Sequence, residues 1–232
     1  MPVHVIHIGK TGGTALKTAL VQAKGIKTPY GPIWRHKHWY TLDEVPEGHF
    51  AIVSVRDPIA RFTSSFYSRL RKGLPRYEFE WTPPEKKAFE TFPTPQELAE
   101  ALGSWSRKRR AAAEKAMRGI RHVKSHYDYW LGSAAEFQKR LPSIAYIARQ
   151  ETLAQDWENI KGIFELPGEI ELPSDPERAH RGDPTEDRTL DRKAVRTLKR
   201  WYRVDYELLD ICEAERKRKG WAEETWEERH AG

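Results

Sequence analysis

The sequence contains a single cysteine and no long apolar run. With Cys212 alone, the chain can form neither an intramolecular disulfide nor a zinc site built from several thiolates, so we expect a reducing, cytoplasmic setting. Nowhere do about 18 apolar residues follow one another, which argues against a membrane-spanning helix and a membrane partner. The only apolar run near the N-terminus is short and ends at Gly9 and Lys10, so we also expect no secretion signal.

The sequence also lacks internal repeats and any cluster of His, Cys, Asp and Glu with the spacing of a metal site, so we expect no metal. Its 232 residues suffice for a compact domain that folds without a disulfide, and we predict a single domain over residues 1–232. The net charge of +6 suits an anionic partner, but it does not choose between nucleic acid, an acidic polysaccharide and a phosphorylated cofactor.

Short β-rich runs are each followed by a turn and an amphipathic helix. The runs cover residues 3–8, 50–55 and 144–148, and the helices that follow them cover 14–21, 59–71 and 153–164. Repeated strand-then-helix units predict an α/β fold with a central parallel sheet flanked by helices. A further long helical stretch is predicted over residues 190–215, with Leu198, Tyr202 and Leu209 on one face.

Two proline-rich segments predict irregular structure. Residues 74–95 hold five of the fifteen prolines and are expected to form an insertion or lid, and residues 166–187 hold four and are expected to form a loop. Between these segments, residues 104–124 carry eight Lys or Arg against one Glu. We expect the run 107–110 to be a solvated helix face or, alternatively, to attract an acidic glycan.

A glycine-rich turn, His7-Ile-Gly-Lys-Thr-Gly-Gly-Thr14, lies where the first predicted strand meets its helix. At such a junction the exposed N–H groups and the helix dipole bind anions. The glycines allow the backbone to close around an oxyanion, the lysine supplies a charge and the threonines supply hydroxyl donors. The expected anion-binding residues are Lys10, Thr11, Gly12, Gly13 and Thr14. The alternative is a tight turn with an exposed lysine.

A nucleoside-triphosphate P-loop is the obvious rival for this turn. It requires a glycine six residues before the lysine, and His4 occupies that position inside the predicted strand. No Walker B acid is evident, and the spacing of the glycines does not match the dinucleotide fingerprint G-x-G-x-x-G either. A P-loop-like kinase therefore stays an alternative that the spacing opposes.

The turn resembles the 5′-phosphosulfate loop of sulfotransferases that use 3′-phosphoadenosine 5′-phosphosulfate (PAPS). Carbohydrate-type enzymes and their bacterial relatives read P-K-T-G-G-T there, and Gly9 stands at the place of the proline. That difference removes no ligand, because neither residue offers a side-chain donor. The resemblance implies a P-loop-like sulfotransferase architecture, PAPS as donor, adenosine 3′,5′-bisphosphate as product, and an acceptor hydroxyl on a sugar or other small molecule.

A second motif, Arg56-Asp-Pro-Ile-Ala-Arg-Phe-Thr-Ser64, follows the second predicted strand and resembles the family's R-D-P-x-x-R-x-x-S. The planar fork of Arg56 suits a phosphate, and Ser64 lies two turns into the next helix, so both can converge on one anion. The resemblance assigns that anion as the 3′-phosphate of the cofactor. We expect Asp57 to cap the helix and Arg61 to be structural, as a surface residue or a buried partner of Asp57.

Sulfuryl transfer requires one group that neutralises the leaving phosphate and one that removes the acceptor proton. Lys10 suits the first task. For the second, His36 and His38 form an H-x-H that resembles the motif after the second strand of uronyl 2-O-sulfotransferases, and a histidine is a workable base near neutral pH. That resemblance ranks His36 slightly ahead of His38. Glu44 is the alternative, since other sulfotransferases use a glutamate.

Weaker matches complete the sequence hypothesis. Arg181 and Gly182 lie in the late loop, where the family often places a basic-glycine segment over the cofactor, so we expect them to bind it. The segment 149–156 resembles the family's R-x-E-x-L-x-x-D. The predicted function is PAPS-dependent sulfuryl transfer to a hydroxyl. A basic nucleic-acid-binding protein is the alternative from another class, and it would explain the charge of residues 104–124 but not the two phosphate loops.

Overall fold

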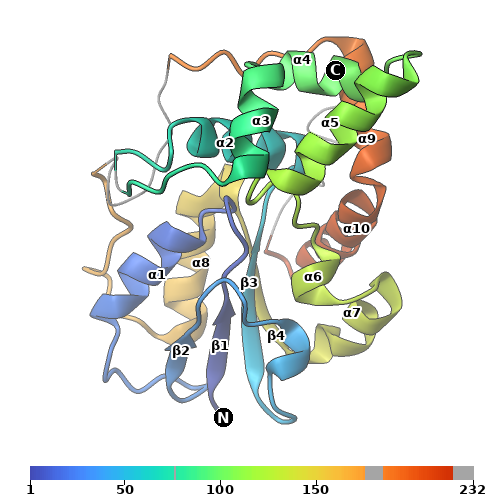
Figure 1. Ribbon diagram of the computed structural model, residues 1–232. Coiled ribbons are helices and arrows are strands. Elements are labelled where there is room, and N and C mark those ends of the chain that lie inside the picture. Colours follow the sequence, from blue (N-terminus) through green and yellow to red (C-terminus); the bar gives the residue numbers. More distant parts are fainter. Residues whose placement is uncertain (76, 176–184, 222–232) are drawn as a thin grey trace. The chain divides into compact units, whose positions relative to one another are not determined.

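The computed structural model describes residues 1–75, 77–175 and 185–221 (Figure 1). The chain divides into two compact units, and each has a hydrophobic core of its own. Unit 1 comprises Met1–Arg56, Tyr127–Ala179 and Glu207–Gly232, and unit 2 comprises Asp57–His126 and His180–Tyr206. The single domain over residues 1–232 stays a prediction, and each unit is described by itself below.

Unit 1 is built on a parallel sheet with the strand order β2-β1-β3-β4. The strands are β1 (Val3–Ile6), β2 (Ile33–Arg35), β3 (Phe50–Val55) and β4 (Ile144–Arg149). Almost every residue of β1, β3 and β4 is buried, as in parallel strands covered on both faces. Because β1 lies between β2 and β3, the strand order reverses there, and this switch point is where open α/β sheets bind ligands. The predicted α/β fold is confirmed.

One face of this sheet is covered by α1 (Gly13–Gln22) and α8 (Leu153–Phe164). Leu16 from α1 and Trp157 and Phe164 from α8 pack with Val3 and Val5 of β1 in one buried cluster. Each such side chain contributes roughly 1.5–3 kcal/mol of transfer free energy when it leaves water. The unit also contains the larger part of α10 (Arg203–Arg218), from Glu207 on. Its other elements are short: η1 (Leu42–Glu44), α6 (Asp128–Leu131), α7 (Ala134–Arg140), η2 (Leu141–Ser143) and η3 (Gln150–Thr152).

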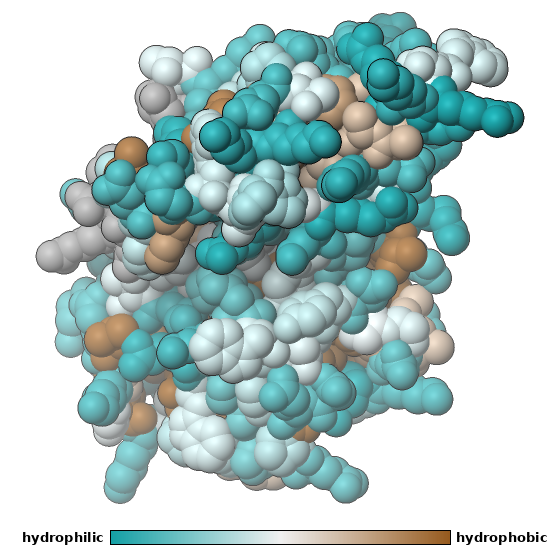
Figure 2. Space-filling model, viewed as in Figure 1, coloured by the Kyte–Doolittle hydropathy of each residue, from teal (hydrophilic) through white to brown (hydrophobic). Residues whose placement is uncertain are grey.

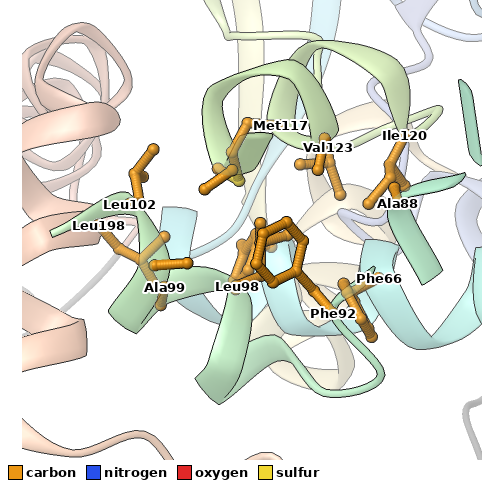
Figure 3. Packing of buried hydrophobic residues seen from close by; sticks show 14 of the residues in the cluster. Phe66, Ala88, Phe92, Leu98, Ala99, Leu102, Met117, Ile120, Val123 and Leu198 are labelled. Atoms are coloured by element: carbon orange, nitrogen blue, oxygen red, sulfur yellow. The ribbon is translucent and has the colours of Figure 1, made fainter. Parts of the chain in front are cut away.

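Unit 2 is helical in the residues that the structure describes. Its helices are α2 (Pro58–Leu70), α3 (Pro83–Thr91), α4 (Pro95–Leu102), α5 (Arg107–Gly119) and α9 (Arg192–Trp201). Figure 3 shows their apolar side chains meeting in one cluster, in which Phe66, Leu98, Met117 and Leu198 are fully buried. The helix starts follow the sequence chemistry, since Asp57 accepts a hydrogen bond from the N–H of Ala60 (2.7 Å) and Pro58 follows it.

The structure corrects two expectations about the chain. Residues 74–95, expected to be irregular, contain α3, whose prolines stand in its first turn and whose Thr82 and Glu85 form a capping box. The helical stretch predicted over 190–215 is two helices, because α9 ends at Trp201 and α10 (Arg203–Arg218) begins after Tyr202.

Two further observations concern the described residues alone. Neither 166–175 nor 185–187, the described parts of the expected loop, contains a helix or a strand. No helix in the described part of the chain combines the length and the apolar character needed to cross a bilayer.

Candidate active site

The glycine-rich turn occupies the carboxyl end of β1, at the switch point of the sheet. Two of its residues have left-handed backbones, Lys10 with φ 69° and Gly12 with φ 82°. Gly12 is the N-cap of α1 and provides no side-chain cap, so the first N–H groups of the helix face the turn without one. Lys10 and Thr14 are both partly exposed there. The turn therefore combines a helix N-terminus with a lysine and a hydroxyl, which suits an oxyanion.

Thr11 has a different position from its neighbours in the turn. Its side chain is fully buried, and its hydroxyl donates to the carbonyl of Ile8 (2.9 Å) and pairs with the hydroxyl of Ser54 in β3 (2.7 Å). Since Thr11 donates to Ile8, Ser54 is the donor in the second bond. The first bond closes the turn on itself, and the second fastens it to β3. Hydroxyl donation from Thr11 to an anion would require the bond to Ile8 to break, and it stays a prediction.

The two adjacent glycines are required for different physical reasons. A Cβ on Gly12 would lie 2.9 Å from Cδ2 of Leu153, and its positive φ is one that other residues adopt at a cost. A Cβ on Gly13 would lie 2.6 Å from Cδ2 of His7, closer than carbon atoms pack. The turn is thus packed closely against the His7 side chain, just after β1, and against Leu153 at the start of α8.

Arg56 follows β3, the strand next to β1, and lies beside the turn. Its Nη1 donates to the carbonyl of Lys10 (3.4 Å). Its backbone is held at both polar groups by Tyr127, whose hydroxyl accepts from the Arg56 N–H (2.9 Å) and donates to the Arg56 carbonyl (2.5 Å). A guanidinium and an ammonium group therefore stand at adjacent strand ends, as the two motifs predict.

Two other predicted cofactor contacts are not tested by this geometry. Ser64 lies in α2, partly buried, and belongs to unit 2, so its convergence with Arg56 on one phosphate stays a prediction. Arg181 and Gly182 lie outside the described residues.

The predicted histidine pair follows β2 directly, next to β1. Lys17, in the second turn of α1, donates to the carbonyl of His36 (2.7 Å) and contacts Nδ1 of His7 (3.3 Å). Burial lowers the pKa of Lys17, and the nearby cations Arg35 and Lys37 lower it further. Burial also lowers the pKa of His36, which the Glu44 carboxylate partly counteracts. His36 is therefore held in its neutral form near neutral pH.

Hydrogen bonds assign the protons on His36 and its neighbours. The hydroxyl of Tyr40 donates to the carbonyl of Glu44 (2.9 Å), so its oxygen can only accept from Nδ1 of His4 (3.0 Å). Nδ1 of His4 must then carry the hydrogen, and the same N–H points to Nε2 of His36 (2.9 Å). His36 consequently accepts through Nε2, and the lone pair it would need as a base is engaged.

The other histidine, His38, is oriented by a hydrogen bond to the turn. Its Nδ1 lies 3.2 Å from the carbonyl of His7, which can only accept, so Nδ1 carries the hydrogen and Nε2 is the basic nitrogen. The ring is exposed and lies against that of His7, with centroids 3.8 Å apart. Trp130 fixes the backbone by donating to the His38 carbonyl (2.6 Å). An oriented Nδ1–H with a basic Nε2 is the arrangement that general-base histidines use.

Glu44, the alternative base, takes part in a capping box. Its carboxylate accepts from the N–H of Thr41 (2.7 Å) and from the Thr41 hydroxyl (2.9 Å). These bonds favour a local structural role at the start of η1.

Arg61 and the segment 149–156 are structural. Arg61 is buried, donates to the carbonyls of Ser125 (2.8 Å) and His122 (3.3 Å), and faces the carboxylate of Asp205 at 3.7 Å. Arg61 is thus structural, as predicted, and Asp57 caps α2 as predicted, while their expected pairing with each other stays a prediction. The segment 149–156 ends β4 and starts α8, where its charged groups are paired inside the protein.

Sequence reasoning did not single out Lys17 or His4, and it did not identify the contact of Tyr127 with Arg56. Lys17 had a local signal, since it lies one turn after Thr14 on the predicted helix. His4 and Tyr127 had none, because their partners His36 and Arg56 are 32 and 71 positions away in the sequence. Within residues 1–75, 77–175 and 185–221, no group of His, Cys, Asp and Glu has the arrangement of a metal site.

An α/β sheet with a basic, glycine-rich turn at its switch point is an arrangement that suits phosphate-type ligands. Comparison with known families is more specific, because the model of the Sulfotransferase family matches residues 2–210. The chain belongs to this family and is a transferase of sulfuryl groups. Neither the curated proteins nor the solved structures contain a match to it.

Proposed function

We propose that the protein transfers the sulfuryl group of PAPS to a hydroxyl of a carbohydrate acceptor and releases adenosine 3′,5′-bisphosphate. The observation that carries this proposal is the turn at the end of β1. Lys10 and Gly12 have left-handed backbones there, Gly12 is the N-cap of α1, and Arg56 contacts the Lys10 carbonyl. Sulfotransferases of this family generally use PAPS.

The residues of the turn fit a phosphosulfate chemically. The groups around it are an ammonium, a guanidinium, the hydroxyl of Thr14 and the first N–H groups of α1, all of them donors to anions. PAPS supplies an activated sulfuryl group on a phosphate that leaves readily. Lys10 and Thr14 would hold the 5′ end of the cofactor, and Arg56 with Ser64 its 3′-phosphate.

The chain's own groups then carry out the transfer. Nε2 of His38 would take the acceptor's hydroxyl proton as that oxygen receives the sulfuryl group supplied by PAPS, whose phosphate would leave. Lys10 stabilises the negative charge that develops on the leaving oxygen. His38 is preferred over His36 because the bond from its Nδ1 to the His7 carbonyl orients the ring beside the turn, whereas Nε2 of His36 accepts from His4.

Cofactor binding is tested by thermal stabilisation of the full chain. Adenosine 3′,5′-bisphosphate should raise the melting temperature, and ATP at the same concentration should raise it less, because a ligand that binds only the folded state stabilises it. A larger shift with ATP would favour a kinase. Radiolabelled PAPS with a panel of hydroxylated acceptors then identifies the acceptor.

The base is tested with a pair of matched variants. His38→Ala should lose about 10²-fold or more in kcat while binding adenosine 3′,5′-bisphosphate normally, and the acidic limb of the pH profile should disappear from its residual rate. His36→Ala should lose less. If both variants keep their activity and Glu44→Gln loses it, the carboxylate is the base.

A further inference from the structure

Unit 2 contains a pocket that belongs to neither phosphate motif. Its volume is about 360 Å³, which is enough for a sugar ring with its substituents. The residues that line it come from the end of α5, the following turn and the end of α9: Met117, Arg118, Lys124, His126 and Trp201. Their side chains combine one apolar group, three basic groups and one large aromatic ring.

A buried carboxylate orients the histidine of this pocket. Nδ1 of His126 lies 2.6 Å from Oδ2 of Asp205, and the Asp205 side chain is fully buried. Because a carboxylate accepts, Nδ1 carries the hydrogen and the ring orientation is fixed. The His126 side chain keeps 26% of its surface exposed, on the pocket wall. Nε2, the other ring nitrogen, is the one left to interact with an occupant.

Buried Arg61 supports the His126–Asp205 pair. Its guanidinium faces Asp205 at 3.7 Å and donates to the carbonyls of His122 and Ser125, on the turn that leads to His126. A buried cation thus offsets the buried carboxylate and braces the turn that carries the histidine. Such support is what a binding group needs in order to keep one orientation.

The remaining walls are positive and aromatic. The Arg118 guanidinium lies over the Trp201 ring, 5.4 Å from its centroid, and pairs with Glu114 only through an exposed contact at 3.5 Å. Lys124 is exposed beside them. Figure 2 shows the strongly hydrophilic side chains that gather over α5, to which the exposed run 107–110 belongs. Since Arg61 offsets Asp205, the pocket presents net positive charge next to an aromatic face.

We propose that this pocket binds an acidic saccharide, a sugar that carries a carboxylate or a sulfate. Arg118, which Trp201 holds by stacking, and Lys124 would bind the anionic substituent, and Nε2 of His126 would bond a hydroxyl. Nucleic acid fits less well, because a duplex would contact the whole basic surface of α5 rather than a pocket of this size. As a binding site the pocket stands alone, whereas its use as an acceptor subsite rests on the proposed function.

The test is calorimetric binding of a sulfated, uronate-containing hexasaccharide to the full chain. The variant Arg118→Ala/Lys124→Ala should weaken binding about tenfold or more, since both lost cations line the pocket. The matched control Lys108→Ala/Lys115→Ala removes the same charge from exposed positions of α5, and it should weaken binding less than about twofold. Neutral maltohexaose should bind at least about tenfold more weakly than the acidic probe.

The outcomes separate a pocket from a diffuse basic surface. Equal losses in the two double variants would overturn the proposal, and so would equal affinity for maltohexaose or tighter binding of an unrelated DNA duplex. His126→Gln should weaken the acidic hexasaccharide as well, and unchanged affinity in that variant would contradict the histidine's role. Stabilisation by adenosine 3′,5′-bisphosphate is measured in parallel, so a failure of the proposed function does not look like a failure of the pocket.

Discussion

The turns at the ends of β1 and β4 differ in how their charges are used, although both match motifs of the same family. After β4, Asp156 is fully buried and accepts from the Arg149 N–H (2.7 Å), Tyr146 (2.7 Å), Thr152 (2.9 Å) and Arg216 (2.9 Å). After β1, the charge of Lys10 is partly exposed, at a helix N-terminus without a side-chain cap.

The difference shows which matches to a family are architectural and which are chemical. A buried carboxylate with several donors stabilises the junction between a strand and a helix, and it leaves no acceptor capacity for a ligand. A cation that keeps contact with solvent at the switch point of the sheet is placed to meet a substrate. Substitutions at the two turns should therefore separate loss of stability from loss of activity.

The largest effect is expected at the β4 turn. Asp156→Ala removes the carboxylate that pairs with buried Arg216 and should lower the free energy of unfolding by about 3–5 kcal/mol, because Arg216 is left with the longer contact to Glu213 (3.9 Å) and the other donors to Asp156 lose their acceptor. Urea denaturation followed by circular dichroism measures it. Glu158→Ala, on the exposed side of the same helix, is the control and should change stability by less than about 1 kcal/mol. Similar losses in both variants would contradict a special role for Asp156.

Lys10→Ala should have the opposite profile. We expect kcat to fall about 10²–10³-fold, because the charge that Lys10 stabilises is fullest in the transition state, while the free energy of unfolding changes by less than about 0.5 kcal/mol. Steady-state kinetics with PAPS and urea denaturation measure the two quantities. Unchanged turnover would assign the role to another residue. Lys10→Arg should restore only part of the rate, because a planar fork does not occupy the position of an ammonium in a tight turn.

Arg56→Ala tests the second cation beside the β1 turn through its effect on ligand affinity. If Arg56 holds the 3′-phosphate, the variant should bind adenosine 3′,5′-bisphosphate more than tenfold less tightly, a loss on the order of 2 kcal/mol. Binding of adenosine 5′-phosphate, which lacks that group, should hardly change. Calorimetry with the two ligands measures both affinities. Equal losses of affinity for the two ligands would contradict the assignment of Arg56 to the 3′-phosphate.

The smallest effect concerns pH and the buried His4. Burial, together with the neighbouring rings of His36 and His49, lowers the pKa of His4 from 6.5 to about 4. The unfolded chain then binds the proton more readily, so the stability due to neutral His4 is complete above pH 6.5 and is lost as the pH falls toward 4. His4→Phe should flatten this fall by about 1–2 kcal/mol. Urea denaturation from pH 7 to pH 4 measures it, and an unchanged slope would contradict the assignment.

Much of the sheet was predictable because its signals are local. Apolar runs located β1, β3 and β4, and helical periodicity located α1, α2 and α8 with small shifts at the ends. The missed α3 also had a local signal, the capping box of Thr82 and Glu85, which the prolines obscured. Prolines in the first turn of a helix are compatible with it, so a high proline content alone does not indicate an irregular segment.

The candidate site was predictable only in part. Spacing identified Lys10 and Arg56, since each follows an apolar run in a motif. The order of the two histidines was not predictable, because it depends on His4 and on the carbonyl of His7, which reach His36 and His38 only in the folded sheet. The buried hydroxyl of Thr11 likewise depends on Ser54, which is 43 positions away.

The left-handed backbone of Lys10 has a consequence for selection experiments. A lysine in that conformation costs about 1 kcal/mol relative to glycine, and such strain persists where a side chain is needed for another purpose. A library randomised at position 10 and sorted for thermal stability alone should therefore become enriched in glycine and asparagine. The same library sorted for sulfated product should return lysine. The residue frequencies at position 10 in the two sorted pools would then show how much stability the lysine costs in exchange for activity.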